Sequence, residues 1–146
     1  MSDSKTSPDS AKQQVADVGK SLLKEAAKIY QDQGRLTDEI LSALHFVYHA
    51  SLQSALELVD KAAVTQVVSA SGRSVYQVIG SSGTPYTCFK TSHYCSCPAF
   101  TYSVLHKEDH MMCKHHLAVE LSNMTGKTKT LNVTDQQLAD MLAMIE

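Results

Sequence analysis

Three cysteines and a histidine form two close pairs in the middle of the chain. Cys95 and Cys97 flank a serine, and Cys113 and His115 flank a lysine after an insert of fifteen residues. Thiolate and neutral imidazole are the ligands that a tetrahedral zinc ion takes in closed structural sites. The spacing therefore predicts one structural zinc ion held between the two pairs.

The two pairs place different demands on the backbone. Side chains at i and i+2 of an extended segment lie on one side, so Cys95 and Cys97 can present both sulfur atoms together. On a helix the same spacing separates side chains by about 200°, so Cys113 and His115 can share a metal only if Cys113 precedes the first full turn. His116 would reach the side of Cys113 more easily, and the residues alone leave the choice between His115 and His116 open. More remote candidates are His93, His106 and His110.

Other residues in the chain could in principle carry chemistry. His45 and His49 have the spacing of a metal-binding pair, but the segment HFVYH lacks the glutamate of a zinc protease, which favours ordinary surface or interface histidines. Cys88 or Cys113 with a nearby histidine could form a nucleophile, yet no nucleophile-elbow or oxyanion-hole pattern accompanies either one. A zinc ion with four protein ligands keeps no position for a catalytic water. We expect a protein that is not an enzyme.

The composition sets the scale of the fold and the compartment. With 146 residues, 43% hydrophobic and 19% charged, the chain predicts one compact unit with a polar tail. No apolar run approaches the roughly 18 residues that a membrane span requires, and the first residues lack the apolar stretch of a secretory signal. For these reasons we expect a nuclear or cytosolic protein, and in such a reducing compartment cysteine pairs bind metals more often than they form disulfides.

The central part of the chain has a net positive charge. The formal net charge is -2, but residues 61–130 carry seven basic and three acidic side chains. This balance permits contact with phosphate, and a module that binds single-stranded DNA directly is the alternative function. Its candidate contacts are Arg73, Lys90, Lys107 and Lys114. Aromatic rings could stack on bases there, but we expect them to form a small core between a sheet and the zinc-bearing helix. They are Tyr76, Tyr86, Phe89, Tyr94, Phe100 and Tyr102.

The pattern of apolar residues predicts an α+β fold. Residues 1–12 are polar and are expected to be a disordered tail. Helical spacing over 13–62 predicts three helices, the first ending near Gly34 and the next two capped by Thr37 and Ser51. Residues 63–90 alternate and are rich in β-branched types, and turns at 71–73 and 81–83 predict a three-stranded antiparallel meander that leads to Cys95.

Helix signals surround the second half of the predicted zinc site. Pro98 is well placed to start a short helix, Cys113 to open the next one and Gly126 to stop it. Together with the meander these helices make a unit over 63–126. Thr134 and Gln137 have the spacing of a capping box, so we expect residues 127–146 to contain a C-terminal helix.

The residues of the site carry a resemblance to a known family. Cys95-x-Cys97, an insert, Cys113-x-His115 and an alanine at 118 resemble the SWIM zinc finger, which is fairly specific because most structural zinc motifs use CxxC pairs. The segments RSVYQVIGSS, HYCSCPAF and CKHHLAV extend the resemblance to the short vertebrate SWIM-containing proteins of the Shu complex. The resemblance implies that His115 is the fourth ligand and leaves Cys88 and His116 outside the finger.

The resemblance also implies a role and partners. Such a protein pairs with a small RecA-like ATPase subunit of the Shu complex in the nucleus. The pair supports the strand-exchange recombinase and its paralogues on single-stranded DNA during homologous recombination. The present sequence has no GxxxxGK[ST] loop, so ATP would be bound by the partner. DNA would then be contacted mainly through the partner.

Overall fold

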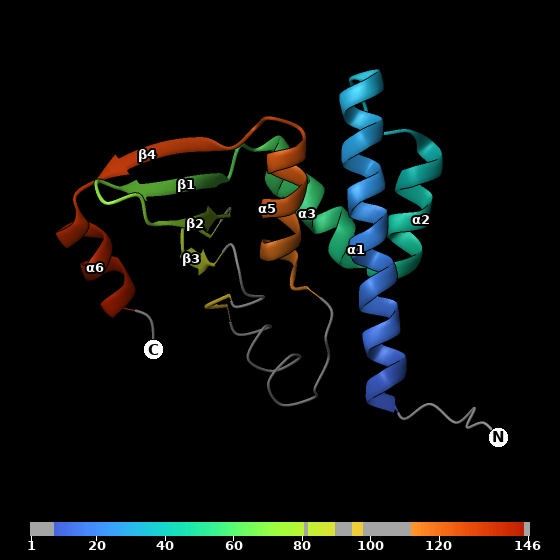
Figure 1. Cartoon of the computed structure of the whole chain (residues 1–146), viewed down its shortest axis with the longest axis horizontal. Coiled ribbons are helices and arrows are strands. Elements are labelled where there is room, and N and C mark those ends of the chain that lie inside the picture. Colours follow the sequence, from blue (N-terminus) through green and yellow to red (C-terminus); the bar gives the residue numbers. More distant parts are fainter. Residues whose placement is uncertain (1–7, 81, 90–94, 98–111, 145–146) are drawn as a thin grey trace.

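The fold is α+β, as the sequence predicts, and is seen here in a computed structural model that describes residues 8–80, 82–89, 95–97 and 112–144 (Figure 1). The described helices are α1 (Pro8–Gln33), α2 (Asp38–Tyr48), α3 (Ala50–Asp60), α5 (Lys114–Met124) and α6 (Asp135–Ala143). The described strands are β1 (Val64–Ser69), β2 (Ser74–Ile79), β3 (Pro85–Cys88) and β4 (Lys129–Val133). None of the described helices is long and apolar enough to cross a membrane.

The strands form one sheet in the order β3-β2-β1-β4. Strands β1, β2 and β3 pair antiparallel and are the predicted meander. Strand β4 was not predicted, and it pairs parallel with β1 at the open edge. Parallel neighbours need a long crossover connection, and α5 lies on the connection that returns to β4. Four of the five β4 residues are exposed, and the segment KTLNV has only two apolar residues, which is a weak strand signal in the sequence.

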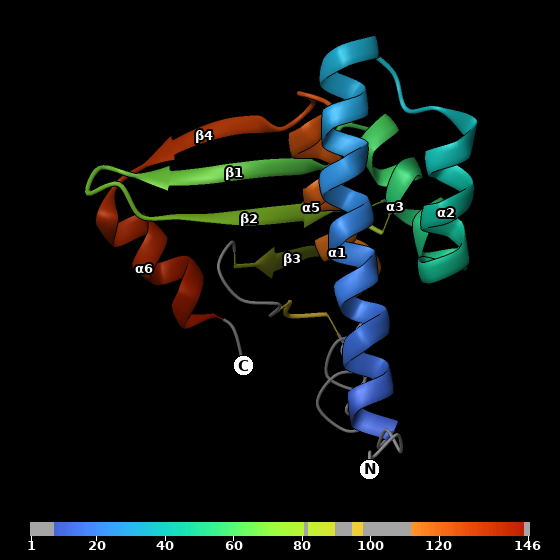
Figure 2. The same ribbon diagram turned by 45° about the vertical axis from the view of Figure 1, so that its right-hand side comes forward.

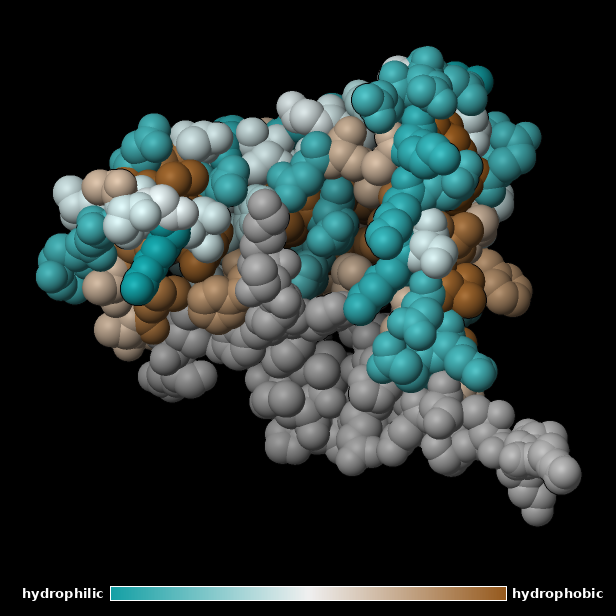
Figure 3. Space-filling view, viewed as in Figure 1, coloured by the Kyte–Doolittle hydropathy of each residue, from teal (hydrophilic) through white to brown (hydrophobic). Residues whose placement is uncertain are grey.

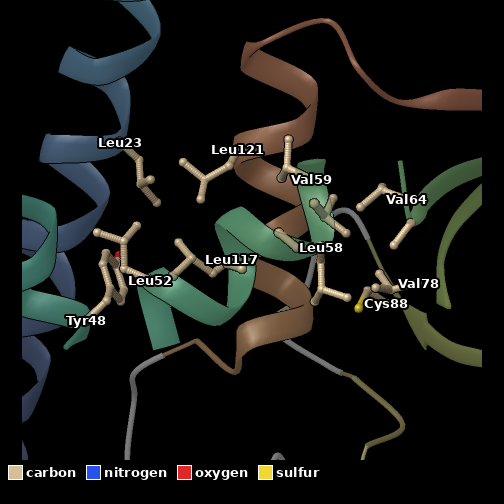
Figure 4. Packing of buried hydrophobic residues seen from close by; sticks show 14 of the residues in the cluster. Leu23, Tyr48, Leu52, Leu58, Val59, Val64, Val78, Cys88, Leu117 and Leu121 are labelled. Atoms are coloured by element: carbon tan, nitrogen blue, oxygen red, sulfur yellow. The ribbon is translucent and has the colours of Figure 1, made fainter. Parts of the chain in front are cut away.

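The two faces of the sheet are covered by different helices. Val64 pairs with Val78 and belongs to the main core, whereas Val67 pairs with Val75 and packs with Leu138 of α6. Because neighbouring side chains on a strand point to opposite faces, α6 covers the face opposite the main core. Figures 1 and 2 show α3 and α5 beside the sheet, with α1 and α2 beyond them. The close view in Figure 4 shows side chains of α1, α3 and α5 meeting in that core.

Most of the predicted helix ends are confirmed. Thr37 caps α2, since its side-chain oxygen accepts a hydrogen bond from the Ile40 N–H at 3.3 Å. The capping box of α6 is complete: the Gln137 N–H donates to Thr134 Oγ1 at 3.0 Å, and the Thr134 N–H donates to Gln137 Oε1 at 2.9 Å. Helix α1 ends just before Gly34, and α5 ends two residues before Gly126.

Two predicted boundaries are wrong, and one helix is not tested. Helix α1 begins at Pro8, so residues 8–12 belong to it rather than to a disordered tail; proline is favourable at a first helical position because its missing N–H would have no partner there. Helix α3 begins at Ala50, so Ser51 lies inside the helix instead of capping it. A single residue, His49 with a φ of 54°, separates α2 from α3. The short helix expected after Pro98 lies outside the described residues.

Helices α1 and α2 approach closely at Gly19. A Cβ atom at this position would overlap the Tyr48 hydroxyl, lie 2.8 Å from Tyr48 Cζ and lie 3.2 Å from a methyl group of Val47. We therefore expect Gly19→Val to lower the free energy of unfolding by about 2 kcal/mol, because overpacking forces the helices apart. Urea unfolding will measure it, with Ser21→Val on the exposed side of α1 as the control. Equal stability of the two variants would contradict this account of the contact.

Tyr48 makes the stability of this helix pair sensitive to alkaline pH. Burial, with a smaller contribution from the nearby Glu120 carboxylate, raises the pKa of Tyr48 to about 12. In the unfolded chain a tyrosine ionises near pH 10, so its contribution to stability is complete below about pH 10 and is lost as the pH rises toward 12. Wild type should lose about 2 kcal/mol more than Tyr48→Phe between pH 9 and pH 12. Urea unfolding of both proteins across that pH range will measure the difference. An equal loss of unfolding free energy in wild type and Tyr48→Phe would refute the prediction.

Candidate metal centre

The four residues predicted from the sequence lie together in space. Ligand atoms of Cys95, Cys97, Cys113 and His115 are all within 4.8 Å of one another. Cys95, Cys97 and His115 are buried, and Cys113 is partly buried. The group lies between the end of the β-meander and the start of α5. Such a group could hold a metal ion.

The first pair of ligands is positioned by the edge strand of the sheet. Cys95 forms an isolated antiparallel bridge with Cys88 of β3. Ser96, between the two ligands, fastens the segment: its N–H donates to the Thr87 carbonyl at 3.0 Å, and its hydroxyl accepts from the Thr87 N–H at 2.9 Å. An extended segment held in this way places Cys95 and Cys97 on the same side, as the i, i+2 spacing predicts.

The second pair is positioned by the first turn of α5. Cys113 is the N-cap, with extended backbone angles of φ -72° and ψ 167°, so it precedes the first full turn. Cys113 and His115 can therefore share a metal ion, because their i, i+2 spacing requires that Cys113 precede the first full turn. His116 is buried but is not part of the ligand group; its Nε2 lies 4.0 Å from Glu120 Oε2 one turn along the helix. His93, His106 and His110 lie outside the described residues.

The His115 side chain packs against β3 and keeps one buried nitrogen atom without a hydrogen-bond partner among the described residues. Its ring packs against Tyr86 of β3, with the ring centroids 4.5 Å apart and the planes inclined by 35°. Its Nδ1 atom is buried and has no hydrogen-bond partner in the part of the chain that the structure describes. A buried polar atom without a partner costs free energy, and coordination of a metal by the imidazole would offset that cost.

The thiols are held in surroundings that favour their protonated form in the absence of a cation. Contacts with the Cys95 and Cys97 thiols, followed by burial, raise the pKa of Cys113. For Cys95 the contact with Cys113 lowers the pKa, but contacts with Cys88 and Cys97 together with burial outweigh it and raise the pKa above its usual range. Three neighbouring thiolates repel one another, and a divalent cation removes that repulsion. Three sulfur atoms and one imidazole nitrogen are a donor set that fits tetrahedral zinc.

Two of the four basic residues considered for DNA contact, Arg73 and Lys114, are among the described residues and line different hollows. Lys114 and Lys61 line a hollow of about 270 Å³ that reaches His115, whereas Arg73 lines a separate hollow beside α6. Arg73 and Lys114 are both exposed, at different sites of the fold. Lys90 and Lys107 lie outside the described residues. DNA contact by these four residues stays a prediction.

The other expectations about reactive and aromatic residues have mixed outcomes. His45 and His49 are exposed, with ring centroids 6.3 Å apart, and neither joins the ligand group. Tyr76 is buried in the core and accepts a hydrogen bond from Asn123 of α5 at 3.1 Å, as a structural role predicts. Phe89 packs instead with the α6 cluster. The rings at 94, 100 and 102 lie outside the described residues.

Sequence reasoning missed the part that β3 plays at the site. Tyr86 packs on the ligand His115, and Cys88 faces the ligand Cys95. The i, i+2 spacing of Tyr86 and Cys88 indicates that both lie on the same face of a strand. Their position relative to the ligands depends on the strand register, which the spacing alone does not fix.

Comparison with known proteins gives close relatives. The chain is 50% identical over 128 residues to mouse zinc finger SWIM domain-containing protein 7, covering 88% of this chain and 84% of the mouse chain. It is 49% identical over 127 residues to the human protein of the same name, covering 87% and 91% of the two chains. The zebrafish protein is 43% identical over 129 residues, covering 88% and 92%. No family model matches the chain, and no solved structure matches it.

Proposed function

Because the chain belongs to the family of zinc finger SWIM domain-containing protein 7, we propose that it is a zinc-stabilised scaffold subunit of a Shu-type complex in the nucleus. In this proposal it pairs with a RecA-like ATPase subunit. The pair supports the strand-exchange recombinase and its paralogues on single-stranded DNA during homologous recombination. The chain binds one zinc ion and has no catalytic role of its own.

One observation carries the zinc part of the proposal. Cys95, Cys97, Cys113 and His115 converge within 4.8 Å, and together they supply all four ligands of a tetrahedral ion. A zinc ion held by four protein ligands has no open position for water or substrate, so its contribution is structural. Within the chain, Cys95 and Cys97 would anchor the ion to β3, while Cys113 and His115 would anchor it to α5.

Exposed apolar side chains on the first two helices support a protein partner. Val15 and Val18 of α1 are 46% and 53% exposed, and Phe46 of α2 is 81% exposed. Figure 3 shows hydrophobic side chains gathered beside α1 over the α2 side of the molecule. An exposed phenylalanine is the strongest single candidate, since aromatic side chains often dominate protein interfaces.

Co-expression with the RecA-like subunit tests the pairing. We expect wild type to retain the ATPase subunit in a pull-down, Phe46→Ala to retain at least tenfold less, and Ser42→Ala, an exposed change on the same helix, to retain a normal amount. His115→Ala should lose both the metal and the partner, because metal binding stabilises the folded chain. Full retention of the partner by a folded, zinc-free variant would overturn the link between zinc and pairing.

A DNA-binding assay separates the scaffold from direct action on DNA. The isolated chain should show no measurable affinity for single-stranded DNA at low salt, whereas the pair should bind it. Binding by the isolated chain that weakens with salt and with Lys114→Ala would instead assign DNA contact to this subunit.

A further inference from the structure

The fourth cysteine of the chain lies beside the ligand group without belonging to it. Cys88 is the last residue of β3 and is fully buried in the main core. Figure 4 shows it next to Val78 and close to Leu58 of α3. It faces Cys95 directly across the isolated antiparallel bridge.

The backbone fixes the relation between these two cysteines. The Ser96 N–H donates to the Thr87 carbonyl at 3.0 Å, so the bonds flank the Cys88 and Cys95 pair and do not join it. In this kind of antiparallel pair the Cα atoms are about 4.5 Å apart and the side chains lie at their closest. The Cys88 and Cys95 side chains therefore lie on the same side of the two paired segments, next to one another.

With zinc bound, the site would carry negative charge that a hydrogen bond from Cys88 could stabilise. A zinc ion with three thiolates and a neutral imidazole leaves one excess negative charge, and these ligands are largely buried. Buried charge is stabilised by hydrogen-bond donors. Cys113 Sγ already accepts a hydrogen bond from the His116 N–H at 3.4 Å. The thiol of Cys88 is a weak donor on the residue that pairs directly with Cys95.

We propose that Cys88 is a positioning residue of the metal centre, whose thiol donates a hydrogen bond to the metal-bound sulfur of Cys95. The proposal rests on the proposed zinc binding by the four ligands. Cys88 is not one of the four residues of the ligand group. It orients the Cys95 side chain and reduces the excess negative charge on that sulfur, as outer-shell hydrogen bonds do at other metal sites.

Substitutions of matched size separate the hydrogen bond from simple packing. Cys88→Val fills similar space with no donor, and Cys88→Ser keeps a donor on a smaller side chain. In the full-length chain, competition with a chelator should show zinc bound about 10- to 100-fold more weakly by Cys88→Val. Cys88→Ser should stay within about threefold of wild type, since the hydroxyl restores the donor. If Cys88→Val fails to fold, Cys88→Ala takes its place in the comparison with serine.

Cobalt substitution gives a readout that packing alone would not move. The sulfur-to-cobalt charge-transfer band reports electron density on the thiolates, so it should shift in Cys88→Val and return toward the wild-type position in Cys88→Ser. Wild type should show three thiolate ligands. Four thiolate ligands in wild type, or equal metal affinity and equal spectra in all the variants, would overturn the role of Cys88 while leaving zinc binding intact. Failure of wild type to bind zinc or cobalt would instead overturn the proposed function along with this inference.

Discussion

Replacing His115 by alanine is expected to remove the metal ion and to destabilise the whole finger region. Three ligands would remain, and the coordination that would join Cys95 and Cys97 to α5 through the ion would be lost. Metal binding free energy at structural zinc sites is folding free energy, about 10–16 kcal/mol in small zinc-binding peptides. The free energy of unfolding should therefore fall by more than about 4 kcal/mol. Metal content by atomic absorption and urea unfolding of the same samples will measure both effects.

His116 provides the matched control for this experiment. It is the neighbouring residue on α5 and is equally buried, but it lies outside the ligand group. His116→Ala should lose some packing and its approach to Glu120, yet keep about one zinc ion per chain. Loss of zinc in His116→Ala together with retention in His115→Ala would show that the ligand group is wrongly assigned.

Leu117→Ala is expected to have the largest effect among changes that leave all four ligands in place. Leu117 is fully buried on α5, and Figure 4 shows it in the core with Leu52 of α3. Shortening it leaves a cavity in the contact between these helices, at a cost of about 2–5 kcal/mol. Because Cys113 and His115 lie at the start of the same helix, a looser α5 should also bind zinc more weakly.

Urea unfolding with zinc present will test the effect of Leu117→Ala. Leu131→Ala is a suitable control, because it removes the same atoms from a side chain on β4 that is 50% exposed. The control should lose less than about 1 kcal/mol. Similar losses in the two variants would mean that the contact of α3 with α5 contributes little to stability.

The ligand set and most elements could be predicted from local patterns, and the errors occur where structure depends on distant contacts. The spacing of two residues between Cys95 and Cys97 predicts that both are ligands, and the spacing of three residues between Thr134 and Gln137 predicts the capping box. The choice of His115 over His116 required the backbone angles of Cys113, which the residue types do not specify. Strand β4 carries little local signal, because its place is set by pairing with β1 and not by an apolar face.

The link between α2 and α3 shows the same limit on a smaller scale. Ser51 is a good helix cap by composition, but the chain turns at His49 with a positive φ that a histidine seldom adopts. The residues on either side of the turn, Tyr48 and Leu52, are both buried in the main core. The role of Cys88 beside the finger was likewise hidden, because it arises from the register between β3 and the segment at Cys95.

The long sequence separation between β1 and β4 sets an order of assembly during synthesis. Thr65 pairs with Lys129, 64 positions further on, so the outer edge of β1 has no β4 partner until at least 64 more residues have been synthesised. Contacts of such long sequence separation form slowly, and an open strand edge can pair with other chains. Capture of an ion by the finger would dock α5 and bring β4 toward that edge. We therefore expect scarcity of zinc to act on newly made chains first, as aggregation during synthesis, before it affects molecules that have already folded.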